Sequence, residues 1–204
     1  MGVAGLNVCY CQAQAVYLTR QLEYIRTISM ARILILYSTT DGHTGKICRR
    51  LQERLQQQGQ QVEIRNIADG PPDSLDTYEK IVIGASIRYG KHQPVVLDFI
   101  RRNRELLERR GNAFFSVNIV ARKPEKDRPE TNPYMKSFLR ISKWRPDRLA
   151  VFAGRLEYPR YGILDRSMIR FIMLITGGPT AHDTVIEYTD WERVDSFADE
   201  IAAM

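Results

Sequence analysis

The sequence predicts an α/β protein built on a doubly wound, five-stranded parallel sheet. The apolar run Ile33–Tyr37 has the length and composition of a strand that is buried on both faces, as strands of parallel sheets are. Four further short apolar runs follow along the chain, and helical patterns separate most of them. Such alternation is typical of a sheet that carries helices on both faces and binds its ligand beyond the carboxyl ends of the strands.

The elements follow in order after the first strand. Ile47, Leu51 and Leu55 recur every fourth residue, which predicts an amphipathic helix over Thr44–Gln58 with Gly59 at its C′ position. The remaining predicted strands are Gln61–Asn66, Tyr78–Gly84, Ala113–Val120 and Leu149–Ala153. The remaining predicted helices are Gln93–Arg110, Pro133–Trp144, Ile163–Thr176 and one that opens with a capping box at Thr189–Glu192 and runs through Ile201.

Hydroxyl groups crowd the junction between the first strand and the first helix. The residues of this junction are Ser38, Thr39, Thr40, Asp41, Gly42, His43 and Thr44. Backbone N–H groups converge at such a turn, and the positive end of the helix dipole lies beside it, which suits a phosphate group. We therefore predict a phosphate cradle at Ser38–Thr44.

The cradle has a simpler alternative, because Ser and Thr are also ordinary turn and N-cap residues. Four hydroxyls within seven residues exceed what capping requires. The segment lacks the Gly-Lys-Ser/Thr of a Walker loop and the GxGxxG of dinucleotide sites. Its spacing resembles the loop with which flavodoxins hold the phosphate of flavin mononucleotide (FMN). His43 either lends an N–H to this site or is an exposed loop residue.

Two further strand ends supply candidate flavin contacts. In a flavodoxin-like order, the loops after the predicted strands Tyr78–Gly84 and Ala113–Val120 flank the isoalloxazine ring. The candidates in the first loop are Ser86, Ile87, Arg88, Tyr89 and Gly90, and those in the second are Phe115, Ser116, Val117 and Asn118. Tyr89 either stacks on the ring or is an ordinary loop aromatic, and Ser116 and Asn118 have the alternative of plain strand-end polarity.

Composition limits the class of protein and of partner. The 204 residues suit one domain, and 44% hydrophobic residues suffice for a core. A net charge of +6 and a pI near 9.3 point toward anionic partners such as nucleic acid, anionic lipid or a carboxylated substrate. Three cysteines, Cys9, Cys11 and Cys48, make no disulfide framework, and three scattered histidines make no metal site, so we expect a cytoplasmic compartment.

Residues 1–29 differ from the rest of the chain. They lack the basic start of a signal peptide, and Asn7 and Gln12 interrupt their apolar stretch. The first strand begins shortly after Met30, a residue that could start translation. We expect 1–29 to be an extension outside the fold, with a helical pattern over Tyr10–Ile28, and 30–204 to be the folded domain.

Several segments resemble one family more closely than flavodoxins at large. They are YSTTDGHT at Tyr37–Thr44, VIGASIRYGKH at Val82–His92, FFSVNIVARKPEK at Phe114–Lys126, WRPDR at Trp144–Arg148, YPRYG at Tyr158–Gly162 and YTDWE at Tyr188–Glu192. Together they are similar to the bacterial flavodoxin-like, quinone-dependent protoporphyrinogen IX dehydrogenases. The resemblance extends from about Met30 to the C-terminus, and the segments in the second half are the most specific.

The resemblance implies a cofactor, a reaction and partners. The cofactor would be FMN, and the reaction the oxidation of protoporphyrinogen IX to protoporphyrin IX in heme biosynthesis. Electrons would pass to menaquinone or ubiquinone at the cytoplasmic face of the inner membrane. No residue of the sequence is assigned as a catalytic base.

A basic insertion distinguishes the chain from a minimal flavodoxin. The segment 121–148 carries nine Lys or Arg against four Asp or Glu. It would emerge beside the flavin, where Arg122, Lys123, Lys126 and Arg128 are candidates for binding the two propionates of a tetrapyrrole. The alternative is a solvated run of charges.

The segment Ile163–Thr176 is an extra apolar helix with no obvious place in a doubly wound fold. It is too short to span a bilayer, so it is either buried, a dimer interface or a peripheral contact with the membrane surface. Arg155, Arg160, Arg166 and Arg170 would favour anionic lipid headgroups.

Two rival functions stay open from the sequence. One is a general FMN quinone reductase or a flavodoxin-type electron carrier, although no nicotinamide-binding signature is visible. The other is a basic nucleic-acid-binding module, which the absence of known motifs and the mingling of acids with bases disfavour.

Overall fold

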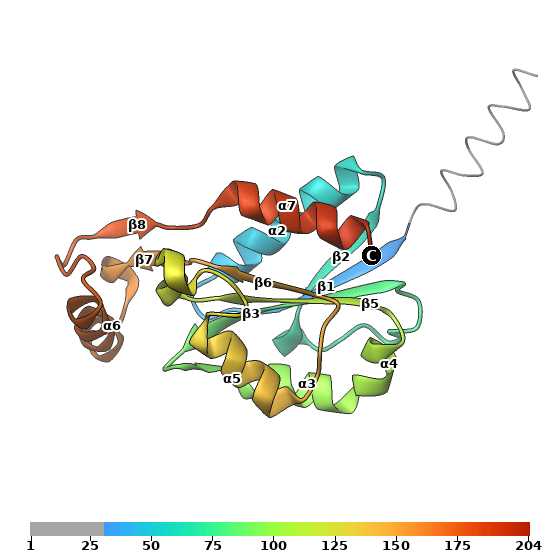
Figure 1. The fold of residues 1–204 in the computed structure, drawn as a ribbon, viewed down its shortest axis with the longest axis horizontal. Coiled ribbons are helices and arrows are strands. Elements are labelled where there is room, and N and C mark those ends of the chain that lie inside the picture. The colour runs from blue at the N-terminus through green and yellow to red at the C-terminus, as the bar shows by residue number, and fades with distance from the viewer. Residues whose placement is uncertain (1–30) are drawn as a thin grey trace, which may run out of the picture.

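A five-stranded parallel sheet lies at the centre of the computed structural model, which describes residues 31–204 (Figure 1). Its strands are β1 (Arg32–Ser38), β2 (Gln61–Asn66), β3 (Lys80–Arg88), β5 (Gly111–Val117) and β6 (Arg148–Phe152). They lie in the order β2-β1-β3-β5-β6, and every neighbouring pair is parallel. The chain therefore reverses its direction of winding beside β1, which is the flavodoxin-like order and confirms the predicted fold class.

Helices cover both faces of this sheet. On one face lie α2 (His43–Gln57) and α7 (Trp191–Ala202), and on the other α3 (Pro94–Arg102), α4 (Arg104–Glu108) and α5 (Pro133–Ser142) (Figure 1). Short 3-10 turns are η1 (Ile67–Asp69), η2 (Ile119–Arg122), η3 (Pro124–Lys126) and η4 (Tyr158–Arg160). The helix α6 (Ile163–Ile175) covers neither face and lies beyond the carboxyl ends of the strands (Figure 1).

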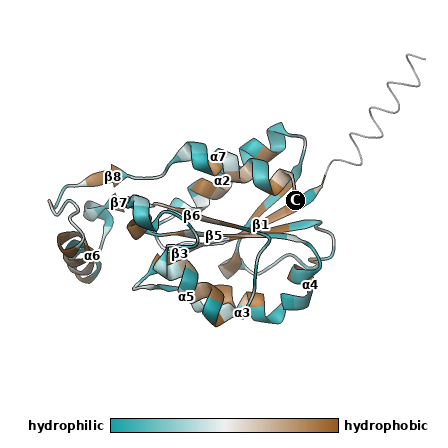
Figure 2. Ribbon diagram, viewed as in Figure 1, coloured by the Kyte–Doolittle hydropathy of each residue, from teal (hydrophilic) through white to brown (hydrophobic). Residues whose placement is uncertain are grey.

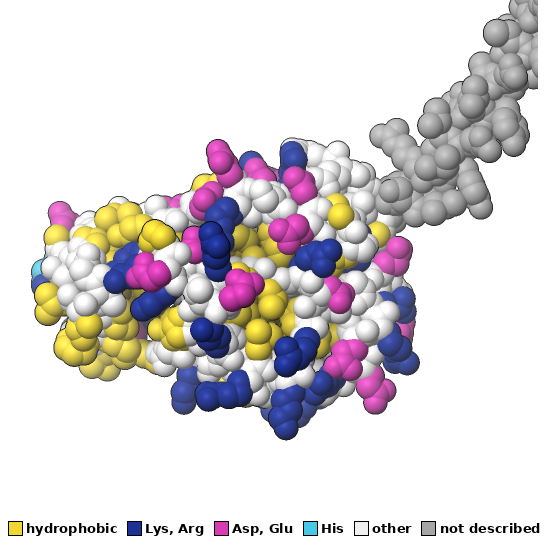
Figure 3. Space-filling view, in the orientation of Figure 1, with side chains coloured by type: hydrophobic (Ala, Val, Ile, Leu, Met, Phe, Trp, Pro, Cys, Tyr) yellow, Lys and Arg dark blue, Asp and Glu magenta, His cyan; other side chains and the backbone are white. Residues whose placement is uncertain are grey.

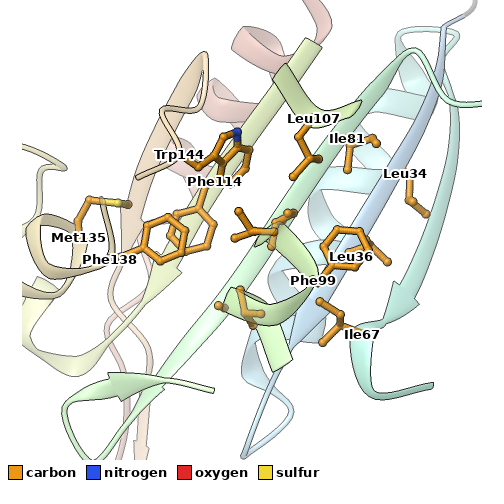
Figure 4. Close-up of a cluster of buried hydrophobic side chains, with 14 of the residues drawn as sticks. Leu34, Leu36, Ile67, Ile81, Phe99, Leu107, Phe114, Met135, Phe138 and Trp144 are labelled. Atoms are coloured by element: carbon orange, nitrogen blue, oxygen red, sulfur yellow. The ribbon is translucent and has the colours of Figure 1, made fainter. Parts of the chain in front are cut away.

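Burial on both faces explains why β1 is apolar throughout its middle. Ile33 and Ile35 pack toward α2 and α7, whereas Leu34 and Leu36 pack toward the opposite helices, and all four are fully buried. In the cluster on the second face, the Phe114 and Phe138 rings stack with centroids 3.8 Å apart, and the Trp144 ring meets both edge-on (Figure 4). Cys48 is a buried, packed residue of α2, as expected. Figure 2 shows apolar residues following the strands and the inner sides of these helices.

Several predicted boundaries shift. The helix expected over 93–110 divides into α3 and α4 at Asn103, whose side-chain amide donates to the Phe99 carbonyl at 2.9 Å and competes with the backbone pattern. The strand expected to end at Gly84 continues to Arg88, because Tyr89 and Gly90 both adopt positive φ and turn the chain into the short strand β4 (Lys91–His92). The 86–90 segment is thus a hairpin rather than a free loop.

The sequence did not reveal a second, two-stranded sheet. After β6 the chain forms β7 (Arg155–Glu157), then η4 and α6, and returns through β8 (Val185–Glu187), which pairs antiparallel with β7. The expected capping box at Thr189–Glu192 is wrong. Asp190 is the N-cap of α7 and accepts from the Arg193 N–H at 3.2 Å, while the Thr189 hydroxyl donates to the Ala153 carbonyl at 2.8 Å.

The predictions for residues 1–29 and for Cys9 and Cys11 lie outside the described residues. Within 31–204, no helix combines the length and the apolar character that a crossing of the bilayer requires.

Candidate functional site

A cleft of about 130 Å³, partly open to solvent, lies at the carboxyl edge of the sheet. The β1–α2 junction, the β3–β4 hairpin, the segment after β5 and the β7–α6 region form its walls. Its lining residues are Thr39, Asp41, His43, Thr44, Ser86, Ile87, Arg88, Tyr89, Gly90, Val117, Asn118, Ile119, Tyr134, Gly154, Arg155, Leu156, Tyr161, Asp165, Met168, Ile169 and Ile172. The apolar and aromatic side chains among the lining suit a flat ring system.

The phosphate loop Ser38–Thr44 has the backbone of an anion site. Gly42 is the N-cap of α2 and adopts a left-handed conformation, with φ of 83°, which a residue with a side chain adopts only with strain. The Gly42 N–H donates to the Thr39 hydroxyl oxygen at 2.9 Å, which holds the loop closed. No side chain caps α2, so its first N–H groups are available to a ligand at the positive end of the helix.

Two buried hydroxyl groups in the cleft have no protein partner. The Thr44 Oγ1 and Ser86 Oγ atoms are buried, and neither forms a hydrogen bond with the protein. Thr44 stands in the first turn of α2, and Ser86 stands on β3, so the two hydroxyls belong to different walls of the same cleft. An unpaired buried hydroxyl costs about 1–3 kcal/mol. A polar ligand with acceptors at both places would remove this cost.

His43 joins the phosphate loop to the C-terminal part of the chain. Its Nε2 atom lies 2.6 Å from the Thr189 hydroxyl oxygen. Because that hydroxyl already donates to the Ala153 carbonyl, it accepts here, which assigns the proton to Nε2 of His43. Burial lowers the pKa of His43, so the ring is neutral at pH 7. The residue is thus neither a free loop histidine nor a cation.

A charged network ties the β3–β4 hairpin to the phosphate loop and to α6. The Arg88 guanidinium lies 3.3 Å from the Asp41 carboxylate and forms a second ion pair with Asp165, in the first turn of α6. The Tyr89 hydroxyl also donates to Asp165, and this bond is the main reason why the pKa of that carboxyl falls below its ordinary value. Burial raises the pKa of Asp41, although Arg88 opposes the change.

The helix α6 forms one wall of the cleft. Met168, Ile169 and Ile172 line the cleft from this helix. At its N-terminal end, the Arg166 guanidinium donates to the Tyr158 and Tyr161 carbonyls, both at 3.2 Å. The sequence predicted this helix but not its place against the cleft.

At its C-terminal end, α6 is held by the insertion. The Arg122 guanidinium donates to the Thr176 hydroxyl at 2.7 Å and to the Thr176 carbonyl at 3.2 Å. The same side chain donates to the Ile119 carbonyl at 3.1 Å. Arg122 therefore has a structural role in positioning α6.

A buried polar chain supports the segment after β5. His92 Nε2 lies 3.0 Å from the Ser116 hydroxyl, and the Asn118 amide donates to that hydroxyl at 3.4 Å. Asn132 donates to the Asn118 side-chain carbonyl at 3.2 Å and also caps α5, by accepting from two backbone N–H groups. Burial lowers the pKa of His92 to about 4, so this ring stays neutral. These hydrogen bonds fix the side chain of Asn118, which lines the cleft.

The structure brings eleven of the predicted cofactor residues to the cleft. These are Thr39, Asp41, His43, Thr44, Ser86, Ile87, Arg88, Tyr89, Gly90, Val117 and Asn118, and their contacts with a cofactor stay a prediction.

Five predicted cofactor residues do not line this cleft, and their part in cofactor binding stays a prediction. They are Ser38, Thr40, Gly42, Phe115 and Ser116. The Ser38 hydroxyl is buried and donates to Gln93 at 2.6 Å, and the same Gln93 amide approaches the Thr40 hydroxyl at 3.4 Å. Phe115 is fully buried in the core between the sheet and α7, because it stands two residues before the carboxyl end of β5, where its ring packs against Phe197 of α7.

The insertion does not deliver its cations to the cleft. Arg122, Lys123, Lys126 and Arg128 are absent from the lining, so the carboxylate site expected there stays a prediction without support from the cleft. The cations that do line the cleft are Arg88 and Arg155. Arg155 was not predicted as a cleft residue, although it lies two residues after the predicted strand Leu149–Ala153 and the rule that ligands bind at strand carboxyl ends would have indicated it.

Comparisons with known proteins agree with this geometry. The flavodoxin domain family matches residues 34–183. A protoporphyrinogen IX dehydrogenase [quinone] of Escherichia coli K12 is 46% identical over 171 residues, which cover 84% of this chain and 94% of that protein. A Leishmania major protein of the same name is 42% identical over 174 residues, covering 85% of this chain and 75% of that protein.

Solved structures agree on the fold. A short-chain flavodoxin associated with a bacterial microcompartment superposes with a TM-score of 0.51 at 12% identity, covering 85% of this chain and 98% of that chain. From the domain match and the extended identity, the chain belongs to the flavodoxin-domain family of quinone-dependent protoporphyrinogen IX dehydrogenases.

Proposed function

We propose that this chain is an FMN-dependent dehydrogenase that oxidises protoporphyrinogen IX to protoporphyrin IX in heme biosynthesis and passes the electrons to menaquinone or ubiquinone. The observation that carries the proposal is the 46% identity to an enzyme of that name over nearly its whole length. The cleft supports it, because a phosphate loop and an apolar wall meet there. The chemistry of hydrogen removal belongs to FMN when it is bound.

Different residues of the cleft suit different parts of FMN. The uncapped N-terminus of α2 and the Thr39 and Thr44 hydroxyls suit the phosphate. Ser86, with its unpaired buried hydroxyl, and the fixed Asn118 amide suit polar atoms of the ring system. Tyr89 is 60% exposed at the tip of the hairpin, and its ring suits stacking.

The remaining residues of the cleft position the substrate and exclude water. Met168, Ile169 and Ile172 present an apolar wall to a large flat substrate. The side chains of Asp41 and Asp165 are paired with Arg88, and the neutral His43 is tethered to Thr189. Each of these titratable groups is therefore engaged in holding the walls of the cleft together, and we assign none of them as a catalytic base.

Docking on the surface of the inner membrane is a second part of the proposal. The outward side of α6 exposes Leu164 at 83%, Phe171 at 62% and Leu174 at 70% of their surfaces. Figure 3 shows hydrophobic side chains gathered at the end of the molecule where α6 lies. An exposed apolar patch of this kind marks an interaction site. The acceptor named for the relatives is a quinone, and ubiquinone and menaquinone reside in lipid, so we commit to an anionic bilayer as the partner. One side of α6 would then contact lipid while the other lines the cleft.

The decisive assay for the reaction uses the purified FMN-loaded protein without oxygen. Addition of protoporphyrinogen IX and a soluble quinone should produce porphyrin fluorescence at a rate that depends on both. Rapid flavin reduction by NADPH, with no reduction by porphyrinogen, would instead favour a general quinone reductase. A colourless protein that binds no added FMN would contradict the proposal.

Docking is tested by flotation with vesicles that contain anionic phospholipid. The wild type should float, and a variant carrying Leu164→Ser, Phe171→Ser and Leu174→Ser should stay in the dense fraction. Ile141→Ser is a matched control, because Ile141 is 59% exposed on α5, away from α6. Equal flotation of all proteins would contradict docking through α6, and a concentration-dependent dimer that the triple variant loses would make this surface a protein interface instead.

A further inference from the structure

A second cleft adjoins the first, between the start of α2 and the turn η4. Its lining residues are Asp41, Gly42, His43, Lys46, Arg49, Arg155, Glu157, Arg160 and Tyr161. Asp41, His43, Arg155 and Tyr161 line both clefts, so the two are direct neighbours. A molecule that occupies the first cleft therefore lies close to the polar groups of the second.

Cations outnumber carboxylates in this second cleft. Lys46, Arg49, Arg155 and Arg160 face only Asp41 and Glu157. Asp41 is already paired with Arg88, which belongs to the first cleft. The second cleft thus offers a surplus of positive charge directly beside the apolar one.

Two of these cations form only weak ion pairs with carboxylates of the protein. Arg155 and Arg160 each reach a different oxygen of Glu157, at 3.3 and 3.8 Å, through one terminal nitrogen. A guanidinium has five N–H donors, so most of theirs stay available to a ligand. Lys46 is more firmly held, by Glu187 at 2.9 Å. The two arginines on the β7–η4 side therefore keep donors for a new anion.

We propose that this basic cleft is the subsite for the two propionate carboxylates of the porphyrinogen, with Arg155 and Arg160 as the principal contacts; this inference rests on the proposed function. Protoporphyrinogen is a large, mostly apolar macrocycle whose two carboxylates lie on one edge. Its apolar body matches the first cleft, and its charged edge matches the adjoining cations. The planar guanidinium fork pairs with a carboxylate through two parallel hydrogen bonds.

The proposal also names cations for the carboxylates in place of those predicted in the insertion. Arg122 is engaged with Thr176 and Ile119, and none of the four predicted cations of the insertion lines either cleft. The segment from β7 through η4 to α6 therefore contributes both an apolar wall and the cations that would bind the carboxylates. Substrate selection and membrane docking would then both depend on this one segment.

The test measures binding of protoporphyrin IX and of its uncharged dimethyl ester to the FMN-loaded protein, by quenching of tryptophan fluorescence. The double variant Arg155→Gln/Arg160→Gln should bind the diacid about tenfold more weakly, from two partly exposed ion pairs, and should bind the ester as the wild type does. The matched control is Arg101→Gln/Arg102→Gln on α3, which removes the same charge from an exposed surface and should change neither affinity.

The outcomes separate this proposal from the proposed function. Unchanged affinity of the double variant for the diacid, or equal weakening for diacid and ester, would overturn the subsite while a wild type that oxidises porphyrinogen keeps its function. Loss of FMN affinity with unchanged porphyrin affinity would assign the cleft to the cofactor phosphate and would also overturn it. A wild type that oxidises neither porphyrinogen nor its ester would refute the proposed function itself.

Discussion

Replacing Thr44 with valine should stabilise the FMN-free protein and weaken its affinity for FMN. Thr44 is fully buried, and its hydroxyl has no protein partner, whereas its methyl group is packed in the first turn of α2. Valine has the same shape and replaces the unpaired hydroxyl by a second methyl group. The substitution therefore removes one polar atom and leaves the packing in place.

The two effects have opposite signs. A buried, unpaired hydroxyl costs about 1–3 kcal/mol, so the free energy of unfolding of the FMN-free Thr44→Val protein should rise by about that amount. In the loaded protein, a hydrogen bond to a charged phosphate contributes about 1.5–3 kcal/mol, and its loss should raise the Kd for FMN about 10- to 150-fold. A residue that is only structural would not show this reversal.

Urea unfolding of the FMN-free protein measures the first effect, and titration with FMN, followed by quenching of flavin fluorescence, measures the second. Thr77→Val is a matched control, because Thr77 lies outside both clefts and its exposed hydroxyl donates to the Ser74 carbonyl at 3.3 Å. It should leave the Kd for FMN unchanged. A Thr44→Val protein with unaltered FMN affinity would refute the cradle, and one that is less stable without FMN would refute the reasoning about the unpaired hydroxyl.

Three further predictions concern the supports of the cleft. Burial lowers the pKa of His92 from about 6.5 in the unfolded chain to about 4 in the folded protein, so between these pH values only the unfolded state binds the proton. The free energy of unfolding should therefore fall by about 3 kcal/mol as the pH drops from 6.5 to 4. In urea titrations at several pH values, the His92→Gln protein should lose this pH dependence. Gly84→Ala would place a Cβ 2.1 Å from Phe115 Cζ, so unfolding should show a loss of about 1–3 kcal/mol, whereas Gly162→Ala, with open space around it, should show little change. Asp165→Asn should speed amide hydrogen exchange in α6, and an unchanged exchange rate there would contradict its role in holding that helix.

Local patterns were sufficient for the central sheet. The strand β1 is apolar on both faces because both faces are buried, and β2 was predicted with its observed ends at Gln61 and Asn66. The helix α2 and the positive φ of Gly59 after it follow from a four-residue repeat and a glycine. These features depend on neighbours in sequence, so the residues themselves reveal them.

The structure brings most of the predicted cofactor residues to the cleft but holds others away from it. Phe115 and Val117 belong to β5 and flank Ser116, yet only Val117 of the three lines the cleft. Phe115 packs over Gly84 on the neighbouring strand, and the Ser116 hydroxyl is held by His92. Which groups reach a ligand was decided by contacts between strands that are far apart in sequence.

By itself, the sequence determined the class of the fold, the phosphate loop, an extra apolar helix and the resemblance that led to the family, because each of these is written in consecutive residues. Only the tertiary structure decided that α6 forms a wall of the first cleft and that Arg155 and Arg160, rather than cations of the insertion, line the second cleft beside it. The physical reason is the pairing of β7 with β8, which brings residues about thirty positions apart together and places α6 beyond the carboxyl ends of the strands. No local periodicity encodes that pairing.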